Sequence, residues 1–335
     1  MNILFDIAHP ADVHFYKNAR LKLEALGHKV IFMARDKDVV IDLLNDLNIP
    51  YEKGSTAQKG LLRLLVELIH WFIRAFILIR RHKINIAVSL SSPSTAWAAK
   101  LNGIPHIMFD DTETALTQMR MARPATKSIF TPACIKANWG SKHKKYNAIH
   151  DMAYLRPEYF SPKQCEKLDD KYAILRFVSW DAAHDWGADK TLPYFQKKIC
   201  KILSKKMKVY ISAEGELPKE LEKFRLPIPA NQLHNALAFA QIVVGDGATT
   251  ATEAAVLGIP SLYISPFATR LGYCTFLQKY GLLSIAGNQK QGLKMLKKML
   301  KEKKASKRKR KEARKKLLKN TIDLTEFIVN QVLSQ

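Results

Sequence analysis

The sequence predicts an α/β protein of two domains, each built on a doubly wound parallel sheet, with the two sheets facing a cleft. Short apolar runs alternate with amphipathic stretches of helical period, and this alternation is typical of parallel strands joined by helices. The alternation fades after residue 154 and begins again at residue 172. The length of 335 residues also favours two domains rather than one.

The first half of the chain supplies the first group of strands. "NILFDIA" has the apolar character of a buried strand, and "ADVHFYKNARLKLEALG" after it has the period of a helix. The same alternation continues to residue 111. We expect strands at 2–8, 28–35, 85–91 and 105–111, and helices at 11–27, 38–48 and 93–103.

The second half repeats this order, with strands expected at 172–180, 208–214, 242–246 and 260–265 and helices at 192–206, 231–241 and 250–257. The stretch 154–170 carries two prolines and no clear period, so the domain boundary is predicted there. Residues 1–160 would form the first domain and 161–319 the second. Residues 320–335 are expected to form a helix that packs back toward the first domain.

The charge of the chain is strongly basic and unevenly placed. The net charge is +24, and residues 290–319 hold 16 Lys and Arg against Glu302 and Glu312. Such a segment suits an anionic membrane surface, or it is a solvated surface helix. Nucleic acid is a less favoured partner, because few aromatic residues interleave the basic ones and no RNA-binding motif accompanies them.

Four scattered cysteines and the start of the chain indicate a cytoplasmic location. Cys134, Cys165, Cys200 and Cys274 show no metal-ligand or paired spacing, so we expect reduced thiols. Met1-Asn2 leads directly into "ILFDI", without a basic region or a cleavage site of a secretory signal.

A glycine-rich turn at 245–247 follows a predicted strand and opens a predicted helix. Gly247 would let a ligand approach the backbone closely, and residues 248–250 would present N–H groups and hydroxyls at a helix N-terminus, where anions bind. Glu253, one turn further on, would be near enough to accept hydrogen bonds from vicinal hydroxyls. A diphosphate at the turn with a ribose on Glu253 is the economical interpretation, and an ordinary turn with a solvent-facing Glu253 is the alternative.

The segment "DGATTATEAAVLGIPSL" resembles the nucleotide-binding segment of GT-B glycosyltransferases. It is similar to the N-acetylglucosaminyltransferase that makes lipid II and to the non-hydrolysing UDP-N-acetylglucosamine 2-epimerases. The resemblance implies a GT-B-like fold of two Rossmann-like domains, with no metal and no cofactor beyond a nucleotide-sugar donor, expected to be UDP-linked. It places Glu253 at the ribose and the following residues at the donor diphosphate: Asp246, Gly247, Ala248, Thr249 and Thr250.

A closer resemblance covers nearly the whole chain. "ILFDIAHPADVHFYKN", "FDDTETA", "YNAIHDMAYLRPEYFSP" and "LRFVSWDAAHDWG" resemble an archaeal and bacterial family catalogued as a domain of unknown function, which is usually placed near the GT-B glycosyltransferases. The resemblance implies the fold but no reaction, so the chemistry has to come from the residues.

The loop after the first strand is the first candidate for that chemistry. The lipid II transferase has a glycine-rich loop here, whereas this chain has His9, Asp12 and His14. These residues could supply a base that activates an acceptor hydroxyl, since an imidazole titrates near neutrality. Alternatively, Asp12 caps the helix and His14 packs in the core. A zinc site is not expected, because no third ligand is evident.

The stretch "MFDDTETALTQ" places three carboxylates at another strand end: Asp110, Asp111 and Glu113. The transferase relatives have an acceptor-contacting motif at this place, and the epimerases have catalytic acids in the neighbourhood. We therefore count Asp111 and Glu113 among the catalytic candidates. Helix capping by Asp111 or Thr112, with Glu113 as a partner, is the alternative.

Further candidates lie on the first two strand ends of the second domain. The resemblance favours Arg176 and Ser179 as donor-phosphate contacts. Glu214 and Glu216, at the end of the next strand, are candidates for base or ribose contacts because of that position. The loop after Ser179 adds Asp181, His184 and Asp185, at a place where the epimerases carry a His–Arg loop. For each residue a surface role is the alternative.

An apolar stretch at 60–83 resembles a membrane span but carries a polar stripe of Arg63, Glu67, His70 and Arg74 at helical spacing. A spanning helix would normally lack that stripe. An interfacial helix fits, and Trp71 and Arg80-Arg81 favour it; a core helix with one polar edge is the alternative.

These observations together predict an inverting glycosyltransferase that moves a sugar from a nucleotide-diphosphate-sugar donor to a cell-surface-glycan or lipid-linked acceptor, at the inner face of the membrane. An NDP-sugar 2-epimerase or hydrolase, acting through carboxylates 110–113 and His184, is the second interpretation. A nucleic-acid-binding protein using the basic segment is the third.

Overall fold

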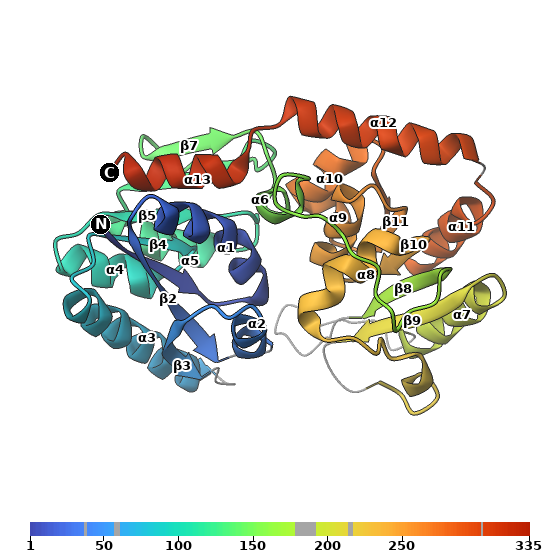
Figure 1. Ribbon diagram of the computed structural model, residues 1–335, viewed down its shortest axis with the longest axis horizontal. Helices are drawn as coiled ribbons and strands as arrows, with labels where there is room; N and C mark the ends of the chain where they lie inside the picture. Colours follow the sequence, from blue (N-terminus) through green and yellow to red (C-terminus); the bar gives the residue numbers. More distant parts are fainter. Residues whose placement is uncertain (37–38, 57–60, 178–191, 214–216, 303) are drawn as a thin grey trace. The chain divides into compact units, whose positions relative to one another are not determined.

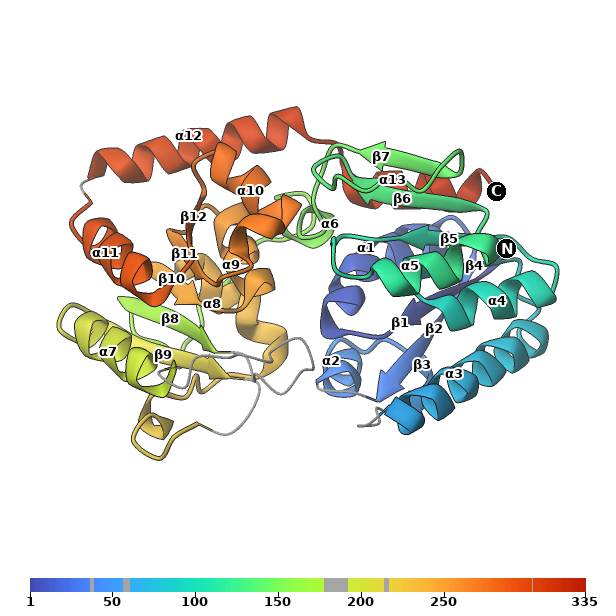
Figure 2. The same ribbon diagram turned by 180° about the vertical axis from the view of Figure 1, so that it is seen from behind.

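The computed structural model describes residues 1–335 except 37–38, 57–60, 178–191, 214–216 and 303. The chain divides into two compact units: Met1–Tyr159 with Thr321–Gln335, and Phe160–Asn320. Each unit is a parallel sheet with helices on its faces, as Figure 1 and the reverse view in Figure 2 show. The predicted pair of doubly wound domains is thereby confirmed.

In the described residues of the first unit, seven parallel strands run in the order β3-β2-β1-β4-β5-β6-β7. The strands are β1 (Asn2–Ile7), β2 (Lys29–Asp36), β3 (Tyr51–Thr56), β4 (Ile86–Leu90), β5 (His106–Phe109), β6 (Ser128–Pro132) and β7 (His143–Tyr146). The helices are α1 (Pro10–Ala25), α2 (Val40–Asp46), α3 (Leu61–Arg81), α4 (Pro93–Leu101), α5 (Leu116–Ala122), α6 (Met152–Leu155) and α13 (Leu324–Leu333).

The second unit has, in its described part, five parallel strands in the order β12-β11-β10-β8-β9. They are β8 (Tyr172–Phe177), β9 (Lys208–Ala213), β10 (Ile242–Gly245), β11 (Ser261–Ile264) and β12 (Leu283–Ala286). The helices are α7 (Leu192–Ser204), α8 (Leu233–Phe239), α9 (Ala248–Val256), α10 (Gly272–Lys279), α11 (Gln289–Met299) and α12 (Lys304–Asn320).

Each sheet has a point where the strand order reverses. In the first sheet this point lies between β1 and β4, and in the second between β8 and β10. Helices leave neighbouring strands toward opposite faces there, so the carboxyl ends of those strands are left open for ligands. Predicted site residues follow two of these strands directly: His9 comes after β1, and Asp246 comes after β10.

Two residues of the predicted polar stripe of α3, Glu67 and Arg74, bind strands of the sheet, whereas His70 is exposed as the predicted polar edge requires. Glu67 is buried and accepts a hydrogen bond from Arg35 of β2 at 2.5 Å, and Arg74 lies 3.1 Å from Glu52 of β3. Trp71, which was expected at a membrane interface, is instead buried and donates to Asp6. The prediction for Trp71 was wrong, because its indole fills the space between α3 and the sheet.

The face of α3 that points away from the buried Trp71, Ala75 and Leu78 is largely apolar and exposed. Four side chains spaced three or four residues apart are 45–56% exposed: Val66, Ile69, Ile73 and Ile77. Among the described residues, no helix is long and apolar enough to cross a membrane. We call these four residues the α3 ridge.

Helix α13 belongs to the first unit although it follows the second in sequence. Phe327 packs against Phe130 and Tyr146 with ring centroids 5.4 Å apart in both contacts. Tyr159 donates to Asp323 at 2.6 Å, so the segments that leave and re-enter the unit lie side by side (Figure 1).

Candidate functional site

The first turn of α1 uses two of the predicted catalytic residues to begin the helix. His9 is the N-cap, and its ring accepts a hydrogen bond from the N–H of Ala11. Asp12 accepts from the N–H groups of Ala8 and His9, both at 2.9 Å. Burial raises the pKa of Asp12 to about 8, although these two bonds lower it. The structure thus gives His9 and Asp12 a capping role, which was the alternative for Asp12.

His14 lies on the same helix, one turn after the cap. It is buried, its ring centroid is 5.2 Å from that of Tyr154, and its Nδ1 is 3.4 Å from the Lys17 ammonium. This placement matches the packed imidazole more closely than an open base.

The end of β5 carries the predicted carboxylates in different surroundings. Asp110 is buried and accepts from the Ser91 hydroxyl at 2.9 Å, and burial raises its pKa to about 7. The side chain of Asp111 is 37% exposed. Glu113 lies near Cys134, whose pKa is raised to about 12 by burial first and by Glu113 second. Asp111 is therefore the more open of the two aspartates.

A residue that the sequence analysis did not single out, His150, lies behind Asp111. Its Nδ1 is 3.3 Å from Oδ2 of Asp111, within ion-pair distance but without the alignment of a hydrogen bond. Its Nε2 is 3.2 Å from the carbonyl oxygen of Ala11. The ring stacks on Phe15, with centroids 4.2 Å apart and planes 20° apart, so it has little freedom to turn.

The contact with Ala11 indicates which ring nitrogen of His150 carries the hydrogen. A carbonyl oxygen only accepts hydrogen bonds, so Nε2 of His150 carries a proton when it bonds Ala11. Nδ1 of the neutral ring is then an acceptor that faces another acceptor, the carboxylate of Asp111. Nδ1 of His150 and Oδ2 of Asp111 are therefore two acceptors that face each other at ion-pair distance.

In the second unit, the glycine-rich turn joins β10 to α9 as predicted. Gly247 is the N-cap of α9 and, as a glycine, has no side chain of its own to cap the helix. A Cβ on Gly245 would lie 2.2 Å from the carbonyl oxygen of Arg176, so only glycine fits there. Thr249 is exposed and Thr250 is buried. The first N–H groups of α9 thus lie at the carboxyl end of β10. The N-terminus of a helix is a favourable place for an anion.

Arg176 ends close to this turn, because β8 pairs with β10. Its guanidinium donates to the Ser212 hydroxyl of β9 at 2.9 Å, and its carbonyl accepts from the N–H of Asp246 at 3.2 Å. The remaining predictions for this edge, Ser179, Asp181, His184, Asp185, Glu214 and Glu216, lie outside the described residues.

Glu253 is buried rather than solvent-facing, so that alternative is wrong. Its Oε1 lies 2.9 Å from Nε2 of His234 on α8, and both side chains are only 6% exposed. His234 is a second residue that the sequence analysis did not single out.

The comparisons with known proteins agree with this architecture. No family model matches the chain, and no curated protein sequence matches it. Among solved structures, Acinetobacter baumannii MurG aligns over 100% of both chains with a TM-score of 0.60 and 16% identity. Staphylococcus aureus MnaA with UDP aligns over 99% of this chain and 95% of its own, with a TM-score of 0.69 and 12% identity. The Neisseria meningitidis UDP-GlcNAc 2-epimerase bound to UDP-GlcNAc aligns over 100% of both, with a TM-score of 0.68 and 12% identity.

The chain has a GT-B fold.

Within this GT-B fold, the predicted residues that the structure describes collect at the carboxyl ends of the strands of their own unit. The first GT-B domain offers an exposed carboxylate backed by an imidazole, which is suited to proton transfer. The second offers an open helix N-terminus, a guanidinium and a buried carboxylate, which are suited to phosphate and hydroxyl groups. The first group is His9, Asp12, His14, Asp110, Asp111 and Glu113; the second is Arg176, Asp246, Gly247, Ala248, Thr249, Thr250 and Glu253.

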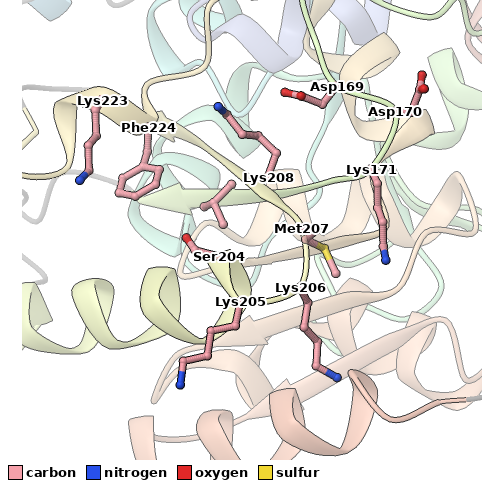
Figure 3. Close-up of a pocket in the computed structure, with 11 residues that line it drawn as sticks. Asp169, Asp170, Lys171, Ser204, Lys205, Lys206, Met207, Lys208, Lys223 and Phe224 are labelled. Atoms are coloured by element: carbon pink, nitrogen blue, oxygen red, sulfur yellow. The ribbon is translucent and has the colours of Figure 1, made fainter.

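The depression in Figure 3 lies elsewhere in the GT-B fold, at the amino edge of the second sheet. It encloses about 810 Å³ between the end of α7 and the start of β9. Its lysines point in different directions rather than toward one another (Figure 3). Because it is at the opposite edge from Arg176 and Gly247, it is no part of the candidate site.

Proposed function

We propose that the protein is an inverting glycosyltransferase that takes a sugar from a nucleotide-diphosphate donor, UDP-linked, and transfers it to a hydroxyl of a surface-glycan or lipid-linked acceptor. The observation that carries the proposal is the N-terminus of α9, which begins after Gly247 at the end of β10. Arg176 lies on the neighbouring strand and Glu253 one turn along the helix. This combination supports binding of a diphosphate and a ribose at one place.

The donor would bind to the second domain by charge and by hydrogen bonds. The first N–H groups of α9 and the Arg176 guanidinium favour the negative diphosphate, and they favour it more as the sugar leaves and charge develops. Glu253 would accept hydrogen bonds from the ribose hydroxyls.

Asp111 is the base that we propose for the acceptor, with His150 behind it. The acceptor hydroxyl gives its proton to the pair, and its oxygen forms a bond to the anomeric carbon. The bond from that carbon to the diphosphate breaks, and its electron pair leaves with the diphosphate. Asp111 suits this role better than His14, because Asp111 is more exposed and its imidazole partner gives the proton a second acceptor.

The second candidate is an NDP-sugar 2-epimerase or hydrolase. Two observations favour it: several solved structures with this fold are UDP-GlcNAc 2-epimerases, and Asp110, Asp111 and Glu113 bring three carboxylates to one strand end. An epimerase removes the proton at C2 of the sugar, whereas a transferase does not.

The two candidates differ in what happens to a donor without an acceptor. We expect UDP-GlcNAc incubated with the protein in deuterium oxide to keep its C2 proton, because a transferase has no step at C2. Proton NMR of the recovered sugar measures this, with a parallel incubation without protein as the control. Deuterium at C2 would replace the transferase by the epimerase.

We further propose that the protein works at the inner face of the cytoplasmic membrane, with a lipid-linked acceptor. The α3 ridge presents apolar side chains to solvent, and helices of this kind bind at the lipid interface. Helix α12 adds exposed cations: Lys307, Arg308, Lys309, Lys311, Lys315, Lys316 and Lys319. Each basic residue near an anionic surface contributes on the order of 1 kcal/mol.

Ile69→Glu is expected to lower binding to phosphatidylglycerol vesicles by about tenfold or more, since burial of an apolar side chain is worth roughly 1.5–3 kcal/mol. Co-sedimentation at low salt measures the bound fraction. Leu21→Glu is the matched control, because Leu21 on α1 is equally exposed, at 57% against 56% for Ile69, but lies outside the α3 ridge. Equal binding of Ile69→Glu and wild type would exclude the α3 ridge from membrane contact.

A further inference from the structure

The buried pair of Glu253 and His234 is the feature from which we infer more. Oε1 of Glu253 and Nε2 of His234 are 2.9 Å apart, and both side chains are 6% exposed. When Glu253 is ionised, its carboxylate only accepts hydrogen bonds, and Nε2–H of His234 is then the donor. A buried carboxylate that lost this donor would be left poorly solvated, which is costly.

The pair lies toward the edge of the sheet where ligands bind. Glu253 is five residues after the start of α9, and helical side chains tilt toward the helix N-terminus, which here is the carboxyl end of β10. His234 is the second residue of α8, and α8 ends just before β10 begins. Since the C-terminus of α8 is at the amino edge, its N-terminus with His234 lies toward the carboxyl edge.

The imidazole is held on a second side. The ring of Phe160 meets that of His234 edge to face, with centroids 6.2 Å apart and planes at 79°. A ring fixed by packing and by one hydrogen bond fixes in turn the carboxylate that accepts the bond. A carboxylate has about four acceptor sites, so the bond from His234 does not exhaust it.

We propose that His234 is a positioning residue for the donor: its Nε2 proton orients the Glu253 carboxylate toward the ribose hydroxyls. This rests on the proposed function, because the ribose contact of Glu253 belongs to it. His234 does not touch the donor. By orienting the carboxylate, His234 lets Glu253 discriminate between a ribose and a deoxyribose. A carboxylate that is free to turn would form a weaker hydrogen bond with the 2′-hydroxyl.

Calorimetry with UDP and 2′-deoxy-UDP tests the inference without an acceptor. We expect wild type to bind UDP about tenfold or more tightly than 2′-deoxy-UDP, since a hydrogen bond to a charged group is being lost. In His234→Leu this ratio should fall toward one. In His234→Gln it should be largely kept, because the glutamine amide places an N–H near the position of Nε2.

Two further variants complete the experiment. Glu253→Gln should lose the ratio as His234→Leu does, and His28→Leu, at a half-buried histidine of the first unit, should keep it. If His234→Leu does not fold, His234→Asn replaces it. The asparagine amide nitrogen takes the position of Nδ1 of the histidine, so the side chain is too short to reach Glu253.

The outcomes separate this inference from the proposed function. If His234→Leu and His234→Asn keep the wild-type preference for UDP over 2′-deoxy-UDP while Glu253→Gln loses it, the role of His234 is wrong. The proposed donor site would be unaffected by that result. A wild-type protein that binds none of UDP, GDP and ADP would contradict the proposed function itself.

Discussion

Asp111→Asn is expected to slow sugar transfer by roughly 10²–10⁴-fold, because it removes the group that we propose takes the proton of the acceptor hydroxyl. Asparagine keeps the size of the side chain but cannot accept that proton. The measurement is the rate of UDP release from UDP-GlcNAc in the presence of a lipid-linked acceptor. The affinity for UDP should stay unchanged, since Asp111 lies in the first unit and the proposed donor site in the second.

The control for this variant is Asp46→Asn, at an exposed aspartate on the last turn of α2. It should transfer sugar at the wild-type rate. His150→Gln keeps a donor toward Ala11 but has no nitrogen at the place of Nδ1, so an intermediate loss is expected. If His14→Gln were inactive while Asp111→Asn kept full activity, the base would be His14.

Gly245→Ala is expected to destabilise the second unit by about 3 kcal/mol or more, because the new Cβ would lie 2.2 Å from the backbone oxygen of Arg176. A backbone atom in the middle of a sheet cannot move aside as a side chain can. That carbonyl also accepts the N–H of Asp246, so any shift disturbs the start of the turn. A thermal scan that resolves the unfolding of the second unit measures the loss.

Gly287→Ala is the matched control, at the end of another strand of the same sheet. Its Cβ would meet only the Gln291 side chain, at an ordinary 3.5 Å. We expect a change of no more than about 1 kcal/mol, of either sign. Equal stability of the two variants would mean that β8 and β10 are not as close at this point as described.

The local geometry of the candidate site in the second unit, where we propose that the donor binds, could be predicted from the sequence because its parts are contiguous. The strand, the turn and the first helical turn are contiguous, so the spacing from Gly247 to Glu253 already sets their geometry. The partner of Glu253 could not be predicted, since His234 reaches it only through the packing of α8 against α9.

The candidate site in the first unit, where we propose that the acceptor binds, was predicted less completely for a similar reason. His150 follows β7, a four-residue strand of sequence "HKKY" whose exposed lysines give it no apolar pattern. Because this strand was not predicted, the sequence did not place His150 at the edge of the sheet. Helix α3 shows the same limit: its period predicted the helix, but Arg35 and Glu52, which pair with Glu67 and Arg74 of its polar stripe, lie on distant strands.

The return of α13 to the first unit has a consequence for how the chain is synthesised. Phe130 and Tyr146 are covered by Phe327, and all of Phe160–Asn320 must be translated before that residue exists. At roughly 5–20 residues per second, this takes on the order of ten seconds or more. During that interval the nascent first unit carries an uncovered aromatic surface, so we expect it to be a client of ribosome-associated chaperones until the last helix emerges.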